Sequence, residues 1–422
     1  MALSSDTKLQ PEAARRERRS IAFITLAACS IFWVFVFADS GWGPILTPLS
    51  NYLHISLVSA GLLYVVWSTG YLPGALVGGA MLDRYGARFV LFTAALIILV
   101  GITLIYMSLL LPFFTPLFAL LVIAGLAGVG GGTIDAATNG LISSIFAHKR
   151  GMALNLFNLL YPLGGIIVAL VDAGLLTFFH NDPRPSFLFT ISFIGVALLS
   201  LLGVPRRYAA EPVHTQPVSP HVDIDAAPDK AGYYPLLKVL LPVIGAMTFT
   251  SGISSSVRVW TPAYLHVAYG QSPAVAAALS SLTWALAVVG RLIAAGLIVR
   301  IGSLRMVMLS VLVTLGGLVA MFFSPNAFLG TIAISLTSMG LSPIVATFLA
   351  IGSERAGRSP GAVAGILLFT SGISTVFCGW LFGFLLKSAG PQWVVIFCMT
   401  FVISGGLMAL RLRVSHQKLG TH

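Results

Sequence analysis

Five ionisable side chains lie within long apolar stretches of the 422-residue sequence: Asp39, Asp135, Asp172, Arg258 and Arg291. Placing such a group at the centre of a lipid bilayer costs about 2.5–3.5 kcal/mol or more, so it is a candidate for function by default. The carboxyl groups could exchange protons, and the guanidinium groups could bind an anion.

Asp135 is the strongest candidate for a proton-coupling acid. A carboxyl group on the wall of a cavity can bind and release a proton as that cavity faces each side of a membrane in turn. Asn139 follows one helical turn later and could bond a sugar hydroxyl or the carboxyl group itself. The structural alternative is a buried acid that only holds a neighbouring helix.

Asp39 directly precedes the segment 40–44, whose sequence Ser-Gly-Trp-Gly-Pro predicts a bend in the helix. Arg258 lies at a corresponding depth in the seventh apolar run. The two could form an outer ion pair that opens and closes, the interpretation we favour, with Asp39 also able to carry a proton. Alternatively, Arg258 could hold an anionic substrate. Arg291 lies in the inner half of its run and could reach the cavity or extend to the membrane surface.

Six more residues could line the same site: Asn155, Asn158, Tyr161, Trp42, Trp260 and Tyr264. The first three recur at three-residue spacing and could either face the cavity or bond between helices. The other three could stack on sugar rings or belong to an aromatic belt at the membrane surface. For Asp172, near the outer end of its run, we expect a structural role or a place at the rim of the cavity.

The elements that must position these residues are membrane-spanning helices. Hydrophobic residues make up 57% of the chain and charged residues only 9%, whereas soluble domains carry about 25% charged residues. Runs long enough to cross a bilayer fall at about 20–48, 56–80, 88–110, 114–146, 151–179, 186–204, 236–265, 273–299, 304–323, 327–353, 359–386 and 391–410. The predicted fold class is an all-α membrane protein with twelve transmembrane helices in two six-helix bundles.

The net charge of +11 follows from membrane topology. Most Lys and Arg residues lie in the two tails and in every second loop, a bias that places both termini in the cytoplasm. We therefore expect a multi-pass protein of the plasma (inner) membrane and no nucleic-acid partner. The first run lacks a small-residue cleavage pattern, so it is interpreted as a helix and not as a signal peptide.

Five regions follow from this pattern: tail 1–19, bundle 20–204, linker 205–235, bundle 236–411 and tail 412–422. The linker is polar and rich in proline, which is typical of a flexible connection. Short matches support two parallel repeats, for example Asp83-Arg-Tyr-Gly86 against Val299-Arg-Ile-Gly302. Substrate is then expected at the midplane between the halves.

The segment 79–88, Gly-Ala-Met-Leu-Asp-Arg-Tyr-Gly-Ala-Arg, resembles the signature G-x-L-x-D-R-x-G-x-R/K of the major facilitator superfamily. Met81 replaces the leucine of that signature. The resemblance implies a gating loop that stabilises the outward-facing state, formed by Gly79, Asp83, Arg84, Gly86 and Arg88. The second copy carries Val299 in place of the aspartate, so a corresponding C-terminal latch should be weaker.

A narrower resemblance links the glycine-rich segment 128–139, with its Asp135 and Asn139, to the fucose/glucose–proton symporters. The segment 260–265, Trp-Thr-Pro-Ala-Tyr-Leu, is similar to their W-x-x-x-Y-L motif. An acidic residue that the family often carries falls near Ser254 here. The segment 150–154 is also similar to monocarboxylate transporters, so the implied sugar substrate has a competitor.

The leading hypothesis is secondary active, proton-coupled uptake of a small polar solute such as a sugar, by alternating access. The alternatives are an organic-anion transporter that uses Arg258 and Arg291, efflux of amphiphilic compounds, or a non-transporting sensor. An enzyme is not expected, since the sequence has no nucleotide-binding loop, nucleophile elbow or metal cluster. We expect no cofactor and no metal. The expected partners are protons, lipid and a small-molecule substrate, and the chain is expected to be monomeric.

Overall fold

The computed structural model describes residues 6–111, 116–146, 156–202, 233–356 and 360–419, and the regular structure in those ranges is helical. The first half contains α1 (Asp6–Ser40), α2 (Trp42–Tyr52), α3 (Leu57–Tyr85), α4 (Ala87–Leu110), α5 (Leu117–Ile145), α7 (Leu160–Phe178) and α8 (Arg184–Leu202). The second half contains α9 (Tyr233–Tyr269), α10 (Pro273–Ile301), α11 (Ser303–Phe322), α12 (Ala327–Leu341), α13 (Ile344–Ala356), α14 (Pro360–Ser388) and α15 (Pro391–Leu419).

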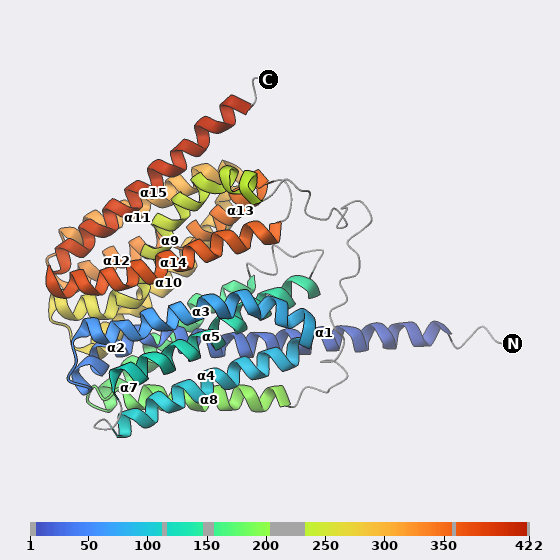
Figure 1. The fold of residues 1–422 in the computed structure, drawn as a ribbon, viewed down its shortest axis with the longest axis horizontal. Coiled ribbons are helices and arrows are strands. Elements are labelled where there is room, and N and C mark those ends of the chain that lie inside the picture. Colours follow the sequence, from blue (N-terminus) through green and yellow to red (C-terminus); the bar gives the residue numbers. More distant parts are fainter. Residues whose placement is uncertain (1–5, 112–115, 147–155, 203–232, 357–359, 420–422) are drawn as a thin grey trace.

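Eleven of the described segments are long and apolar enough to cross a membrane, and the shorter apolar segment Arg184–Leu199 of α8 completes the predicted set of twelve. The helices α1–α8 form one bundle and α9–α15 form a second beside it, with both termini toward the same end of the molecule (Figure 1). These features confirm the predicted all-helical membrane fold. Because the sequence predicts cytoplasmic termini, we call the opposite end, which carries α2, the outer end.

Two predicted helices are interrupted. α1 ends at Ser40 and α2 begins at Trp42, within the segment where a bend is predicted. The predicted helix 327–353 is divided into α12 and α13 at Ser342 and Pro343, because proline has no N–H for the helical hydrogen bond.

Several helix ends differ from the predicted boundaries. α1 extends back to Asp6 and α15 extends to Leu419, so helix continues into both predicted tails. α9 begins at Tyr233, inside the predicted linker, and residues 205–232 of that linker lie outside the described residues. The exact boundaries of the five predicted regions therefore stay a prediction.

Two equivalent glycines mark the internal repeat in the backbone. Gly86 joins α3 to α4 with φ 77°, and Gly302 joins α10 to α11 with φ 81°. Each donates its backbone N–H to a carbonyl four residues earlier, Leu82 at 3.0 Å and Ile298 at 2.8 Å. Positive φ is available to glycine without steric cost, so the repeated glycine of the sequence match has a conformational reason.

The glycine-rich stretch of α5 lets that helix approach α3 backbone to backbone. A Cβ atom at Gly128 would lie 2.1 Å from the carbonyl oxygen of Trp67, and one at Gly132 would lie 2.1 Å from that of Tyr71. A side chain at either position would force the two helices apart. This close packing holds Trp67 and Tyr71 against the acids described below.

The two bundles interlock near the outer end through a buried tryptophan. The indole of Trp260 on α9 is 1% exposed and lies between Gly61 on α3 and Gly383 on α14. A Cβ atom at either glycine would lie 2.3 Å from the indole ring. The outer contact between the bundles therefore depends on the absence of side chains at two positions.

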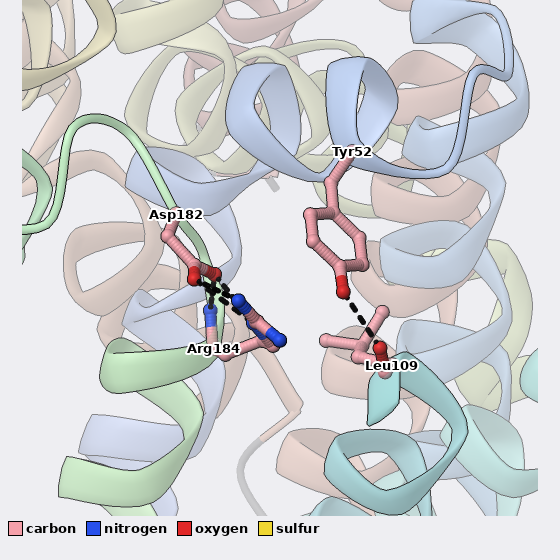
Figure 2. Close-up of polar contacts among 4 residues, drawn as sticks. All are labelled: Tyr52, Leu109, Asp182 and Arg184. Carbon is pink, nitrogen blue, oxygen red and sulfur yellow. Dashed lines mark hydrogen bonds and ion pairs between the residues drawn. The ribbon is translucent and has the colours of Figure 1, made fainter. Parts of the chain in front are cut away.

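A polar cluster joins α2, α4 and the start of α8 at the outer end (Figure 2). Tyr52 donates its hydroxyl to the carbonyl of Leu109 at 2.8 Å, and the Arg184 guanidinium lies 5.2 Å from the Tyr52 ring centroid. Arg184 also pairs with Asp182 at 2.6 Å. Burial alone would raise the pKa of Asp182, but the hydrogen bonds and charge of Arg184 outweigh it and lower that pKa.

Candidate substrate and proton site

The carboxyl group of Asp39 is held by two aromatic donors. The indole Nε1 of Trp67 donates to its Oδ1 at 2.9 Å, and the hydroxyl of Tyr161 donates to its Oδ2. Asp39 lies in the last turn of α1, directly before the break at Gly41, and is 8% exposed. The interruption of the first helix thus places a buried, fully bonded acid between α3 and α7.

The Arg258 guanidinium faces Tyr161 from the other bundle but does not reach Asp39. Its Nη1 donates to Ser254 at 2.6 Å and its Nη2 to Ser255 at 3.2 Å. Its Cζ lies 5.9 Å from the centroid of the Tyr161 ring and 5.7 Å from that of Trp284, which is within cation–π range.

The expected ion pair of Asp39 with Arg258, which should open and close, is not formed in this conformation. Among the described residues, Asp39 forms no ion pair, and its carboxyl oxygens accept from Trp67 and Tyr161 instead. Tyr161 lies between Asp39 and Arg258 because it bonds the acid with its hydroxyl and faces the guanidinium with its ring. The acid and the cation still interact through space.

Asp135 forms the centre of a second polar chain in the first bundle. Tyr71 donates its hydroxyl to Oδ2, and the Asn139 amide donates to Oδ1 at 2.7 Å. The Asn158 amide in turn donates to Asn139 Oδ1 at 2.9 Å. Both oxygens of Asp135 therefore act as acceptors, which suits an ionised carboxylate.

Arg291 on α10 bonds across to the first bundle. Its Nη1 donates to the main-chain carbonyl of Asn158 at 3.0 Å, and its Nε donates to Ser342 Oγ at 3.1 Å. The side chain thus reaches the space between the bundles and does not extend to the membrane surface. Arg291 and Arg258 are close enough to interact electrostatically, although the sequence suggests that they lie on opposite sides of the midplane.

The three aromatic candidates at the outer end are packed inside the protein. Trp42 and Trp260 are 1% exposed and Tyr264 is 3% exposed, so the alternative of a membrane-surface aromatic belt is wrong. Trp260 instead fills the contact between the bundles described above.

The remaining candidates are placed only in part. Asn155 lies outside the described residues. In the expected gating loop, Gly79 and Asp83 belong to the last turns of α3, Arg84 is exposed, Gly86 joins α3 to α4, and Arg88 lies in the first turn of α4. Asp172 is buried near Ser186 in α8.

Sequence reasoning missed five residues of the site: Trp67, Tyr71, Ser255, Trp284 and Ser342. Trp67 and Tyr71 are one helical turn apart on α3, opposite Gly128 and Gly132, which have the same spacing on α5. That matched spacing is the signal that could have found them. Trp284 packs on Gly165 of α7 and lies 5.6 Å from the Tyr161 ring, a contact without any sequence signal.

Two helical bundles with an internal repeat, acids inside the first bundle and half-buried arginines that face it from the second define the class of membrane transporters that work by moving their halves against each other. The chain belongs to the Major Facilitator Superfamily, whose family model matches residues 28–376. This confirms the superfamily that the signature at 79–88 implies, and it accords with a transporter and not an enzyme.

Sequence identity to individual proteins is low. The hexuronate transporter of Bacillus subtilis (strain 168) is 24% identical over 379 residues, which is 84% of this chain and 84% of that protein. The sodium-dependent glucose transporter 1A of Mus musculus is 24% identical over 129 residues, covering 31% of this chain and 29% of that protein.

Solved transporters share the fold. The inward-open xylose transporter XylE from E. coli aligns with a TM-score of 0.71 at 14% identity, over 93% of this chain and 95% of that one. The E. coli fucose–proton symporter FucP aligns with a TM-score of 0.62 at 16% identity, over 93% and 99%. At such identities these structures show the fold alone.

Proposed function

We propose that this transporter moves a small hydroxylated carboxylate, such as a sugar acid, together with protons by alternating access between its bundles. The proposal joins the two hypotheses that the sequence leaves open, a sugar-like solute and an organic anion. The similarity to a hexuronate transporter supports it, because a hexuronate is a sugar that carries a carboxylate.

The observation that carries the proposal is the environment of Arg258. Its guanidinium contacts two serine hydroxyls and two aromatic rings. In the described residues it has no carboxylate in contact, since Asp39 is bonded by Trp67 and Tyr161. A half-buried cation with neutral neighbours favours an anionic ligand, and a guanidinium can bind a carboxylate with two parallel hydrogen bonds.

Arg291 adds a second positive charge to the same space. Because it interacts with Arg258 electrostatically, an anion between the two arginines would reduce their repulsion. The half-buried Tyr161 ring beside Arg258 offers a flat surface on which a sugar ring can pack, with the buried Trp284 ring behind it. This arrangement fits a ligand with one charged end and a hydroxylated ring.

Asp135 is the proposed proton carrier. Its side chain is half-buried in the first bundle and accepts hydrogen bonds from the neutral groups of Tyr71 and Asn139. Neither partner compensates a full negative charge as a cation would, so uptake of a proton leaves no opposite charge behind. We assign a supporting role to Asp39, which is buried where Asp135 is only half-buried.

Binding of D-glucuronate and D-glucose to the purified protein tests the substrate class, because the two sugars share a ring and differ in the carboxylate. We expect glucuronate to raise the melting temperature and glucose to raise it much less; at 100 times Kd the stabilisation is about 2.7 kcal/mol. Arg258→Gln should abolish the glucuronate effect, whereas Arg305→Gln, at an exposed position on α11, should retain it. Equal stabilisation by both sugars would favour a neutral sugar as the substrate.

A further inference from the structure

The main-chain carbonyl of Asn158, just before α7, has an unusual donor. In a regular helix this carbonyl would accept from the residue four positions later, but that residue is Pro162, which has no N–H. The Nη1 of Arg291, from the other bundle, donates to it instead at 3.0 Å. The proline thus keeps an acceptor available for a contact between α7 and α10.

The arginine that makes this contact is oriented from its own bundle. Arg291 Nε donates to Ser342 Oγ at 3.1 Å, and that hydroxyl donates to the carbonyl of Ala287 at 2.8 Å. Ser342 lies at the break between α12 and α13. One guanidinium therefore connects α7 with α10 and with the interrupted helix of the second bundle.

The side chain of Asn158 connects, through Asn139, to Asp135 in the first bundle. Asn158 Nδ2 donates to Asn139 Oδ1 at 2.9 Å, and Asn139 Nδ2 donates to Asp135 Oδ1 at 2.7 Å. In the part of the chain that the structure describes, Asn158 joins Asp135 to the contact between the bundles, with its amide on one side and its carbonyl on the other.

We propose that Asn158 is a positioning residue that couples the proton on Asp135 to the contact of α7 with α10. The proposal rests on the proposed role of Asp135 as proton carrier. The Asn139 bond to an ionised carboxylate is charge-assisted, and it weakens when the carboxylate takes up a proton. Asn139 and Asn158 can then reorient, and the carbonyl that Arg291 binds moves with them.

In the described part of the protein, several other titratable groups face the hydrogen-bonded series Asp135, Asn139 and Asn158. From α3, Tyr71 bonds Asp135, and from α1, Asp39 acts on it through space. From the second bundle, Arg258 faces the ring of Tyr161 on α7, and Arg291 bonds the carbonyl of Asn158 just before α7. Because coupling is reciprocal, an anion that draws Arg291 away from Asn158 would in turn change how strongly Asp135 holds its proton.

The test measures the separation of the bundles as a function of pH, with protons as the only ligand. Spin labels are attached to Tyr85→Cys and Val299→Cys, exposed positions near the inner ends of α3 and α10, in a variant whose three native cysteines are replaced by serine. Infrared difference spectra follow the protonation of Asp135, identified as the carboxyl band that Asp135→Asn removes.

We expect the wild-type distance distribution to shift with pH and the Asp135→Asn distribution to stay in its low-pH form. Asn158→Ala should keep the Asp135 band and lose the pH-dependent shift. Asn139→Leu breaks the neighbouring bond and should do the same, which keeps the test available if Asn158→Ala does not fold. Thr177→Ala, an exposed position on α7, serves as the control and should keep both signals.

Two outcomes separate the claims. If Asn158→Ala and Asn139→Leu keep the full pH-dependent shift while Asp135→Asn loses it, the coupling role of Asn158 is overturned and the proton role of Asp135 stands. If Asp135→Asn keeps both the wild-type infrared spectrum and the shift, the proton assignment fails, and the role of Asn158 fails with it.

Discussion

Tyr161 separates Asp39 from Arg258: its hydroxyl donates to the carboxylate, and its ring centroid lies 5.9 Å from the guanidinium carbon. The negative charge is therefore held within the first bundle by neutral donors. The positive charge, on α9, remains available to a ligand that enters between the bundles.

This arrangement predicts which pair of residues is energetically coupled. Tyr161→Phe removes a hydrogen bond to a carboxyl group, a change that costs about 1.5–3 kcal/mol when the acceptor is charged. We expect Tyr161→Phe to lower the free energy of unfolding by much less when Asp39 is already replaced by Asn. Double-mutant cycles of thermal unfolding should give a larger coupling for Tyr161 with Asp39 than for Arg258 with Asp39. A larger coupling of Arg258 with Asp39 would instead support a direct ion pair between them.

Asp135→Asn should abolish accumulation of substrate driven by a pH gradient and leave exchange of substrate across the membrane at least partly intact. The amide resembles the protonated carboxyl in shape and charge, so the carrier can cycle but cannot release a proton. Uptake of labelled glucuronate into proteoliposomes, with and without a gradient, measures both activities. The matched control is Asp172→Asn, which changes a buried acid that is not bonded to Asp135. Unchanged accumulation in Asp135→Asn would remove Asp135 from the mechanism.

Gly61→Ala should prevent the outer contact between the bundles from closing. The added methyl group would lie 2.3 Å from the Trp260 indole, which is itself enclosed by Gly383 on the opposite side. We expect loss of transport, together with increased labelling of Tyr64→Cys, which is buried near this contact in the wild type. Gly316→Ala, where a methyl group would meet nothing within 4 Å, should leave both unchanged.

The ion pair of Asp182 with Arg184 at the outer end (Figure 2) should make a small, pH-dependent contribution to stability. Since Arg184 lowers the pKa of Asp182 in the folded protein, the stabilisation is present above the unfolded value of about 3.9 and is lost as the pH falls through the lower folded value. Asp182→Asn should therefore destabilise the protein at pH 7 by less than about 1 kcal/mol. The difference from wild type should shrink in melts at acid pH; a constant difference would contradict this origin.

The orientation in the membrane is testable by labelling. A cysteine at Ser219, in the predicted cytoplasmic linker and outside the described residues, should resist an impermeant reagent applied to intact cells. A cysteine at Ser388, exposed at the outer end of α14, should react. Labelling at Ser219 alone would invert the proposed orientation.

Several features of this protein could be predicted from its sequence because each has a local physical cause. Length and hydropathy predict the spanning helices, since lipid requires long apolar segments. The segment 40–44 predicts the break between α1 and α2, and glycine at positions 86 and 302 predicts equivalent turns in the two halves. Asp39, Asp135, Arg258 and Arg291 are visible as candidates because a charge in an apolar run is costly.

The partners of those charges were decided only by the tertiary structure. Trp67, Tyr71 and Tyr161 bond the two acids, yet a Trp or Tyr in an apolar helix carries no charge and has little cost that would reveal its role. Whether Arg258 reaches Asp39, or Arg291 reaches Asn158, depends on how closely helices distant in sequence approach one another. That approach is set by packing between helices, such as α5 against α3 at Gly128 and Gly132, and packing is a property of the assembled bundles.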